Sequence, residues 1–204
     1  MNINSIFFKL KLYLIIGGLA ILLMGLRDMY VDTTSAINYN NTQNNNLSWG
    51  TVVEGELPLN YGIFSKKTTK IETNEYSTLS YLIPIATDHF SSLDVRNKEL
   101  QSQLNKQYND YVNAQNSSEI VTIPSVHFRG IVRPMRDNTI RRIKRYLISS
   151  GTDASEIENR LVSYQIYCKE FSNWLNTIIF GSALFLIGIV FSIIQYRDNK
   201  KPSK

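Results

Sequence analysis

The sequence predicts an α+β fold in which two transmembrane helices flank a compact domain of about five or six short, mainly antiparallel strands and two or three helices. Two long apolar segments lie near the two ends of the chain. Between them, apolar residues recur in some places with the period of strands and in others with that of helices. We therefore expect one extramembrane domain, whose strands could also close into a small barrel.

The second apolar segment is the strongest single signal. Residues 176–195, NTIIFGSALFLIGIVFSIIQ, include no charged side chain, and twelve of the twenty are Leu, Ile, Val or Phe. As a helix this run would reach about 30 Å, the thickness of the hydrocarbon core of a bilayer. Trp174 and Tyr196 lie at its two ends, where aromatic rings favour the headgroup region. We expect a transmembrane helix over residues 174–196.

The first apolar segment, Leu12–Leu26, is shorter and allows two interpretations. Lysines precede it, and residues 34–36 (Thr-Ser-Ala) resemble the cleavage site of a signal peptide. That site lies about ten residues beyond the apolar core, which is farther than processing normally allows. Arg27 can extend its long side chain to the interface, so we favour a retained transmembrane helix over residues 12–30.

The net charge of +5 belongs to the chain ends. Residues 28–173 carry 15 basic and 16 acidic side chains, so the excess positive charge lies in the tails, 1–11 and 197–204, and beside them. A nearly neutral domain gives no indication of nucleic-acid binding. Lys and Arg near membrane spans favour the cytoplasmic side. We expect a multi-pass plasma-membrane protein with both termini in the cytoplasm and the central domain outside.

Both apolar segments carry glycines seven residues apart, Gly18 and Gly25 in the first and Gly181 and Gly188 in the second. Residues with this spacing share a helix face, and glycine lets two backbones approach closely. We expect these four residues to form a helix–helix contact. The alternative is that glycine is simply frequent in membrane helices.

We expect the Asn-rich residues 31–48 to form a solvated tether, and residues 49–173 to form the folded extracytoplasmic domain. Alternating apolar residues predict the strands of this domain. These strands are Thr51–Leu57, Tyr61–Phe64, Leu79–Ile85, Ile120–Ile123, Val126–Val132 and Val162–Cys168. The polar stretch Lys66–Asn74 predicts a turn region.

Capping residues and helical spacing predict the helices of the domain. Asp94 is the expected cap of a helix that ends near Asn116. Asp137 is the expected cap of a second helix, and Gly151 ends it because glycine readily adopts the left-handed conformation. Asp153 opens a short third helix with a capping box.

Two membrane helices with basic flanks bracket the segments VVEGELPLNYGIFSKK, YLIPI, HFRGIVRPM and SYQIY. In this arrangement the chain resembles an uncharacterised family of small bacterial two-pass membrane proteins with an extracytoplasmic α+β domain, described as a domain of unknown function. The resemblance implies this architecture and this location. It implies no activity and no functional residues.

Residues with catalytic or metal-binding chemistry are sparse. His89 and His127 have no second His or Cys at ligand spacing, so we expect no metal site, and no motif indicates a cofactor. Cys168 is the only cysteine and ends an apolar strand face, which favours a buried, inert thiol over a nucleophile. The sequence holds no G-x-S-x-G, Walker or G-x-G-x-x-G motif.

Residues 129–145 concentrate positive charge, with six arginines and one lysine against one acid. Arginine suits phosphate and carboxylate groups, so this cluster could dock on anionic lipid or on an acidic protein partner. The alternative is a solvated face whose charge is neutralised by Glu54 and Glu56. The candidate residues for this surface are Arg129, Arg133, Arg141, Arg142 and Arg145.

Taken together, these patterns favour a membrane-anchored, non-catalytic interaction, sensing or accessory module. The alternative is a cell-surface enzyme, such as a hydrolase of envelope components, whose site matches no known motif. An enzyme should present converging polar groups in a concave pocket, whereas an interaction module should present a broad patch.

Overall fold

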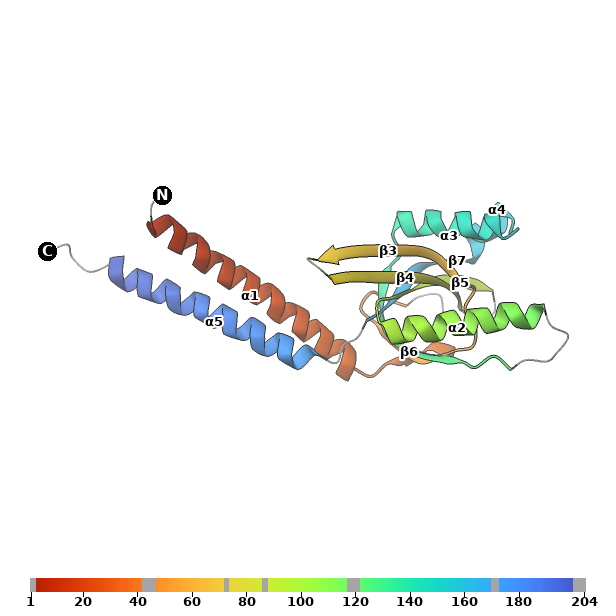
Figure 1. Ribbon diagram of the computed structural model, residues 1–204, viewed down its shortest axis with the longest axis horizontal. Coiled ribbons are helices and arrows are strands. Elements are labelled where there is room, and N and C mark those ends of the chain that lie inside the picture. Colours follow the sequence, from red (N-terminus) through yellow and green to blue (C-terminus); the bar gives the residue numbers. More distant parts are fainter. Residues whose placement is uncertain are drawn as a thin grey trace. The chain divides into compact units, whose positions relative to one another are not determined.

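The computed structural model describes residues 3–41, 47–71, 74–85, 88–116, 122–169 and 173–199. The chain divides into two compact units. One unit joins the two ends of the chain, Met1–Thr34 and Phe171–Lys204, and the other is the continuous segment Ser35–Glu170. Figure 1 shows the elements of both units.

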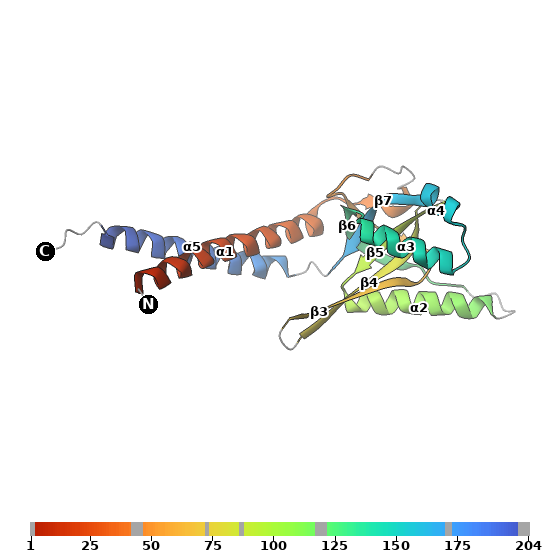
Figure 2. The same ribbon diagram turned by 90° about the horizontal axis from the view of Figure 1, so that it is seen from above.

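The first unit consists of two long helices, α1 (Ile3–Thr33) and α5 (Trp174–Asn199), which lie against each other as Figures 1 and 2 both show. Both are long and apolar enough to cross a membrane, over Lys9–Thr33 and Trp174–Arg197. Only 11% of the most apolar stretch of each helix is buried. A helix inside a soluble core would bury far more of its apolar surface.

Glycines form the contact between these helices. A Cβ atom on Gly18 would lie 2.5 Å from the backbone N of Phe185, and one on Gly181 would lie 2.5 Å from that of Leu22. Any side chain at either position would therefore force the two backbones apart. The structure also places Gly25 and Gly188 at the contact, facing Ile178 and Ile15 respectively.

The contacts show that α1 and α5 are antiparallel. At one end Lys11 Nζ donates a hydrogen bond to Gln195 Oε1 at 2.7 Å. At the other end Trp174 Nε1 donates one to Asp32 Oδ2 at 3.0 Å. Residues early in α1 thus contact residues late in α5, and the first and last residues of this helix pair lie at the same end of it.

The second unit is built on a mixed, open sheet of seven strands in the described residues, in the order β1-β2-β6-β7-β5-β4-β3. The β1–β2 and β5–β7 pairs are parallel and the other four pairs are antiparallel. The sheet is open, so the small barrel that the sequence also allowed does not form. The strands are β1 (Ile37–Asn38), β2 (Val52–Leu57), β3 (Ile63–Ile71), β4 (Asn74–Ile85), β5 (His89–Val95), β6 (Val126–Pro134) and β7 (Leu161–Cys168).

Helices cover both faces of this sheet, with α2 (Lys98–Gln115) on one side and α3 (Asp137–Ser149) on the other (Figure 1). The larger core lies under α2, where Leu104 packs with residues such as Tyr81 and Phe128. The smaller core joins Leu82 of β4 to Ile143 of α3 and to Ile157 of α4 (Ala154–Arg160). The helices on the two sides of the sheet therefore pack on two separate apolar clusters.

The folded unit begins earlier than the sequence predicted, because part of the expected tether belongs to it. Ile37 and Asn38 form β1, and Tyr39 begins the 3-10 helix η1 (Tyr39–Asn41). Tyr39 is buried, and its ring packs edge-on against Phe128 at a centroid distance of 5.1 Å. A Cβ atom on Gly55 would lie 2.8 Å from Cβ of Tyr39, so the glycine makes room for this ring.

The polar stretch predicted as a turn is instead a long hairpin, since β3 continues to Ile71 and β4 begins at Asn74. Strand β5 was not predicted, because its buried Ser91 and Ser92 interrupt the apolar alternation. Of the strand predicted over 120–123, residues 120 and 121 lie outside the described residues and 122–123 are not in a strand.

Two helix starts also differ from the expected caps. Asn97, not Asp94, caps α2, and its side chain accepts a hydrogen bond from the Leu100 N–H at 3.0 Å. Asp137 is the first residue of α3, and Arg136 occupies the cap position without a side-chain hydrogen bond. Asp153 caps α4 as predicted, and Gly151 follows α3 with a φ of 89°.

Gly18 and Gly17 provide a matched test of the helix contact. Gly18→Ala should destabilise the helix pair by about 1–3 kcal/mol, because the methyl group would meet the backbone of α5. Gly17→Ala meets nothing within 4 Å, so it should keep or slightly raise stability through helix propensity. Thermal unfolding of both variants in detergent measures the difference. Equal midpoints for the two variants would contradict this contact.

Candidate functional site

A group of interacting charged side chains lies on the strand pair β2–β6, on the sheet face opposite Phe128. The antiparallel register places Glu54 opposite Arg129 and Glu56 opposite His127. Side chains directly opposite each other on neighbouring strands share a face and are close enough to interact. The pairing of β2 with β6 therefore brings together two charged or titratable groups from each of two strands that are far apart in the sequence.

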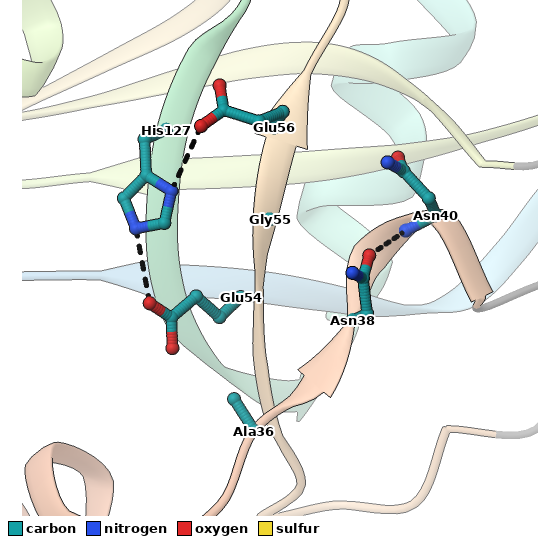
Figure 3. Close-up of a pocket in the computed structure, with 7 residues that line it drawn as sticks. All are labelled: Ala36, Asn38, Asn40, Glu54, Gly55, Glu56 and His127. Atoms are coloured by element: carbon teal, nitrogen blue, oxygen red, sulfur yellow. Dashed lines mark hydrogen bonds and ion pairs between the residues drawn. The ribbon is translucent and has the colours of Figure 1, made fainter.

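In this group the imidazole of His127 lies between two carboxylates (Figure 3). His127 Nε2 is 3.2 Å from Glu54 Oε1, and Nδ1 is 3.3 Å from Glu56 Oε1. Arg129 forms an ion pair with the second carboxylate oxygen of Glu54, and the Ser125 hydroxyl donates to Glu56 Oε2 at 2.9 Å. Both carboxylates are therefore already engaged by neighbouring side chains.

These carboxylates and the imidazole border an open depression of about 370 Å³. The His127 side chain is 59% exposed and the Glu56 side chain 52% exposed. Water at such a site screens the interactions, so each pair contributes on the order of 1 kcal/mol or less to stability. The lining residues are Ala36, Asn38, Asn40, Glu54, Gly55, Glu56 and His127 (Figure 3).

Chemically, this arrangement places an imidazole between two carboxylates, and both kinds of group serve as general acids and bases in enzymes. Asn38 and Asn40 add amide groups at the rim, and the Asn40 N–H donates to Asn38 Oδ1 at 2.9 Å. Within the described part of the chain, no group of three or more His, Cys, Asp or Glu residues is arranged to hold a metal ion.

The structure separates the five candidate arginines into two groups. Arg129 and Arg133 lie on β6, where Arg129 pairs with Glu54 and the Arg133 guanidinium stacks 3.9 Å above the Tyr167 ring. Arg142 lies on α3 and donates a hydrogen bond to the Ser65 hydroxyl on β3. Three strands separate β6 from β3 in the sheet, which corresponds to about 19 Å. The two groups therefore do not form one continuous cluster.

The α3 group is more open to solvent. Arg141, Arg142 and Arg145 are all exposed, on the side of the helix opposite the buried Ile143 and Leu147. Among the described residues, none of the three makes an ion pair with a carboxylate.

A family model described as "Domain of unknown function (DUF8577)" matches residues 3–195. The chain belongs to this family. The match covers both apolar helices as well as the domain between them, so the DUF8577 region includes helices and sheet together. Comparison with curated proteins finds no match.

The two other candidate residues in this DUF8577 chain lie apart from the β2–β6 group. His89 is the first residue of β5 and pairs with Ile85 of β4. Cys168 ends β7 and is buried, and its Sγ occupies the space beside Gly130, where a Cβ would lie only 2.7 Å away. Burial raises the pKa of the Cys168 thiol well above its usual range, and the charge of Asp94 acts in the same direction.

Sequence reasoning missed the contact between Glu54, His127 and Arg129. Glu54 and Glu56 were considered only as acids that could neutralise the arginines. The useful signal was the alternation of charged with uncharged residues over Val53–Leu57 and Val126–Gly130, which places Glu54, Glu56, His127 and Arg129 on the polar face. The register that makes them neighbours is set by long-range pairing, which a local pattern does not specify.

Cys168 should be unreactive toward dithiobis(nitrobenzoic acid) in the folded protein. A raised pKa means that less thiolate is present at any given pH, and burial also blocks access. Raising the pH from about 7 to about 9 should therefore not speed the reaction before unfolding, although it would for an ordinary thiol. A Ser102→Cys variant, exposed on α2, is the positive control. Similar rates for wild type and this variant would contradict the buried site.

Proposed function

We propose that this protein is a two-pass plasma-membrane protein that holds its α+β domain outside the cell as a non-catalytic interaction module. The observation that carries the proposal is the antiparallel glycine contact between α1 and α5. A helix pair of this kind anchors the chain at both ends of the domain. It also supports retention of the first helix rather than its removal as a signal peptide, because α1 packs along α5.

The outer surface of the helix pair supports a lipid environment. Large apolar side chains are exposed along both helices, for example Leu23 on α1 and Leu186 on α5. Soluble proteins rarely leave apolar surfaces of this extent in water. Lipid tails would remove that unfavourable exposure, at about 25 cal/mol for each Å² of apolar surface.

The orientation follows from charge. Because the helices are antiparallel, the two chain termini lie on one side of a membrane that both helices cross. Lys9 and Lys11 lie at the start of the first span and Arg197 lies at the end of the second, with further lysines after it in the sequence. Positive residues next to spans are retained in the cytoplasm, which supports cytoplasmic termini and an external domain.

An interaction role fits the exposed charges of the domain better than a catalytic role does. Electrostatic catalysis is strongest in a dry, enclosed site. The depression at His127 is open to water, and its carboxylates are already engaged. The arginines of α3, in contrast, are exposed and make no ion pair within the described residues. Such side chains are available to a partner.

The second candidate is a surface enzyme that hydrolyses envelope components. One observation favours it, which is the His127 imidazole between the Glu54 and Glu56 carboxylates. A His127→Gln substitution separates the two candidates, since it removes proton transfer but leaves the rest of the surface intact. If the protein is an interaction module, chemical crosslinking in membranes should capture the same partner protein with this variant as with wild type. Loss of a hydrolytic activity with unchanged partner capture would favour the enzyme.

Cysteine labelling of intact cells tests the topology. A membrane-impermeant maleimide should label Ser102→Cys on the exposed side of α2, and should label Ser203→Cys only after the membrane is permeabilised. Wild-type protein should be labelled only weakly in both conditions and so serves as the background control, since its single cysteine, Cys168, is buried. Labelling of Ser203→Cys in intact cells, with Ser102→Cys protected, would reverse the proposed orientation.

A further inference from the structure

Six exposed cations surround one edge of the sheet, and we call this group the basic edge. Three are on β3 and three on α3, and all six side chains are exposed. Among the described residues, none of them forms an ion pair with a carboxylate. The residues of the basic edge are Lys66, Lys67, Lys70, Arg141, Arg142 and Arg145.

A direct contact joins the two halves of the basic edge. Arg142 Nη1 donates a hydrogen bond to the Ser65 hydroxyl, which places the arginine face of α3 beside β3. Ile143 and Leu147 anchor α3 in the smaller core, so the helix is held in this position by buried apolar contacts. The arginines are therefore presented by a packed helix.

Strand β3 is the last strand of the sheet in the described part of the chain. It pairs with β4 along one side over Ile63–Ile71, and no described strand pairs with its other side. An open strand edge presents a row of backbone N–H and C=O groups that can accept one more strand. Segments of partner proteins commonly bind in this way.

The cations lie on both sides of this open strand. Side chains alternate along a strand, so Lys67 lies on the same face as Ser65, toward α3, while Lys66 and Lys70 lie on the opposite face. A flat lipid surface would meet only one of these faces. An added strand, whose own side chains alternate between the two faces, would meet both.

We propose that the basic edge binds an extended acidic segment of a partner protein, which adds to β3 as a further strand. The proposal rests on the interaction role proposed above and names the chemistry of the partner. Backbone hydrogen bonds supply affinity, and acidic side chains on both faces pair with the lysines and with the α3 arginines. The lysines also disfavour pairing of two copies of β3, because like charges would face each other.

Peptide binding to the full-length protein in detergent tests this proposal. The probe is a fluorescent peptide in which Glu alternates with Thr, and its anisotropy should rise on binding. The same peptide with Gln in place of Glu should bind at least about tenfold more weakly, because it lacks the charges. An N-methylated Glu-Thr peptide should also lose binding, since it cannot form the backbone hydrogen bonds of a strand. Equal binding by the N-methylated peptide would overturn strand addition.

Charge variants locate the site. The triple variants Lys66→Gln/Lys67→Gln/Lys70→Gln and Arg141→Gln/Arg142→Gln/Arg145→Gln should each weaken Glu-Thr binding by about tenfold. The control is Lys98→Gln/Lys106→Gln, which removes two exposed lysines from α2, outside the basic edge, and should bind as wild type does. An unreactive Cys168 verifies that each variant is folded. An equal loss in the control would overturn the assignment.

The same assay in nanodiscs distinguishes protein from lipid as the partner. Binding of the Glu-Thr peptide should be similar in neutral and anionic nanodiscs. If anionic nanodiscs alone abolish it in a salt-sensitive way, headgroups occupy the basic edge and the peptide proposal is wrong. Because the detergent assay does not depend on orientation, a reversed topology would overturn the proposed function and leave this result unchanged. If the topology is as proposed but the peptide does not bind, this inference is overturned and the proposed function stands.

Discussion

The close backbone contact between Gly18 and Gly181 is the constraint on which the rest of the architecture depends. It requires two positions without side chains, and it joins helices from the two ends of the chain. Because the contact is antiparallel, the sequence between the helices leaves and returns at the same end of the pair. One continuous segment, Ser35–Glu170, then forms the folded unit. In lipid, where no hydrophobic force drives two helices together, close packing of this kind supplies the association.

Within the folded unit, the order of strands decides which charges are neutralised and which remain available. Strand β6 lies inside the sheet between β2 and β7, so Arg129 meets Glu54 and Arg133 meets Tyr167. Strand β3 lies at the edge, so its lysines meet solvent. The same kind of residue therefore stabilises the sheet in one place and forms an accessible surface in another.

Sequence patterns predicted the elements with strong local signals, such as α5, β2, β7 and the cap of α4. They missed β5, whose Ser91 is buried because its hydroxyl donates to the Tyr164 carbonyl at 2.6 Å, a contact from another part of the chain. They also mistook β3 for a turn, since an exposed edge strand needs no apolar alternation. The five arginines were grouped by closeness in sequence, although three intervening strands separate Arg129 from Arg142.

Distances between spin labels in reconstituted lipid test the antiparallel helix pair most directly. Labels at Leu10→Cys and Tyr196→Cys, both exposed, should be about 20 Å apart, since packed helix axes lie about 8–10 Å apart and the labels add length. Labels at Leu10→Cys and Leu175→Cys should be about 35 Å apart, because the second helix rises about 1.5 Å per residue between the two sites. A short distance for the second pair and a long one for the first would contradict the antiparallel arrangement, as would broad distributions for both.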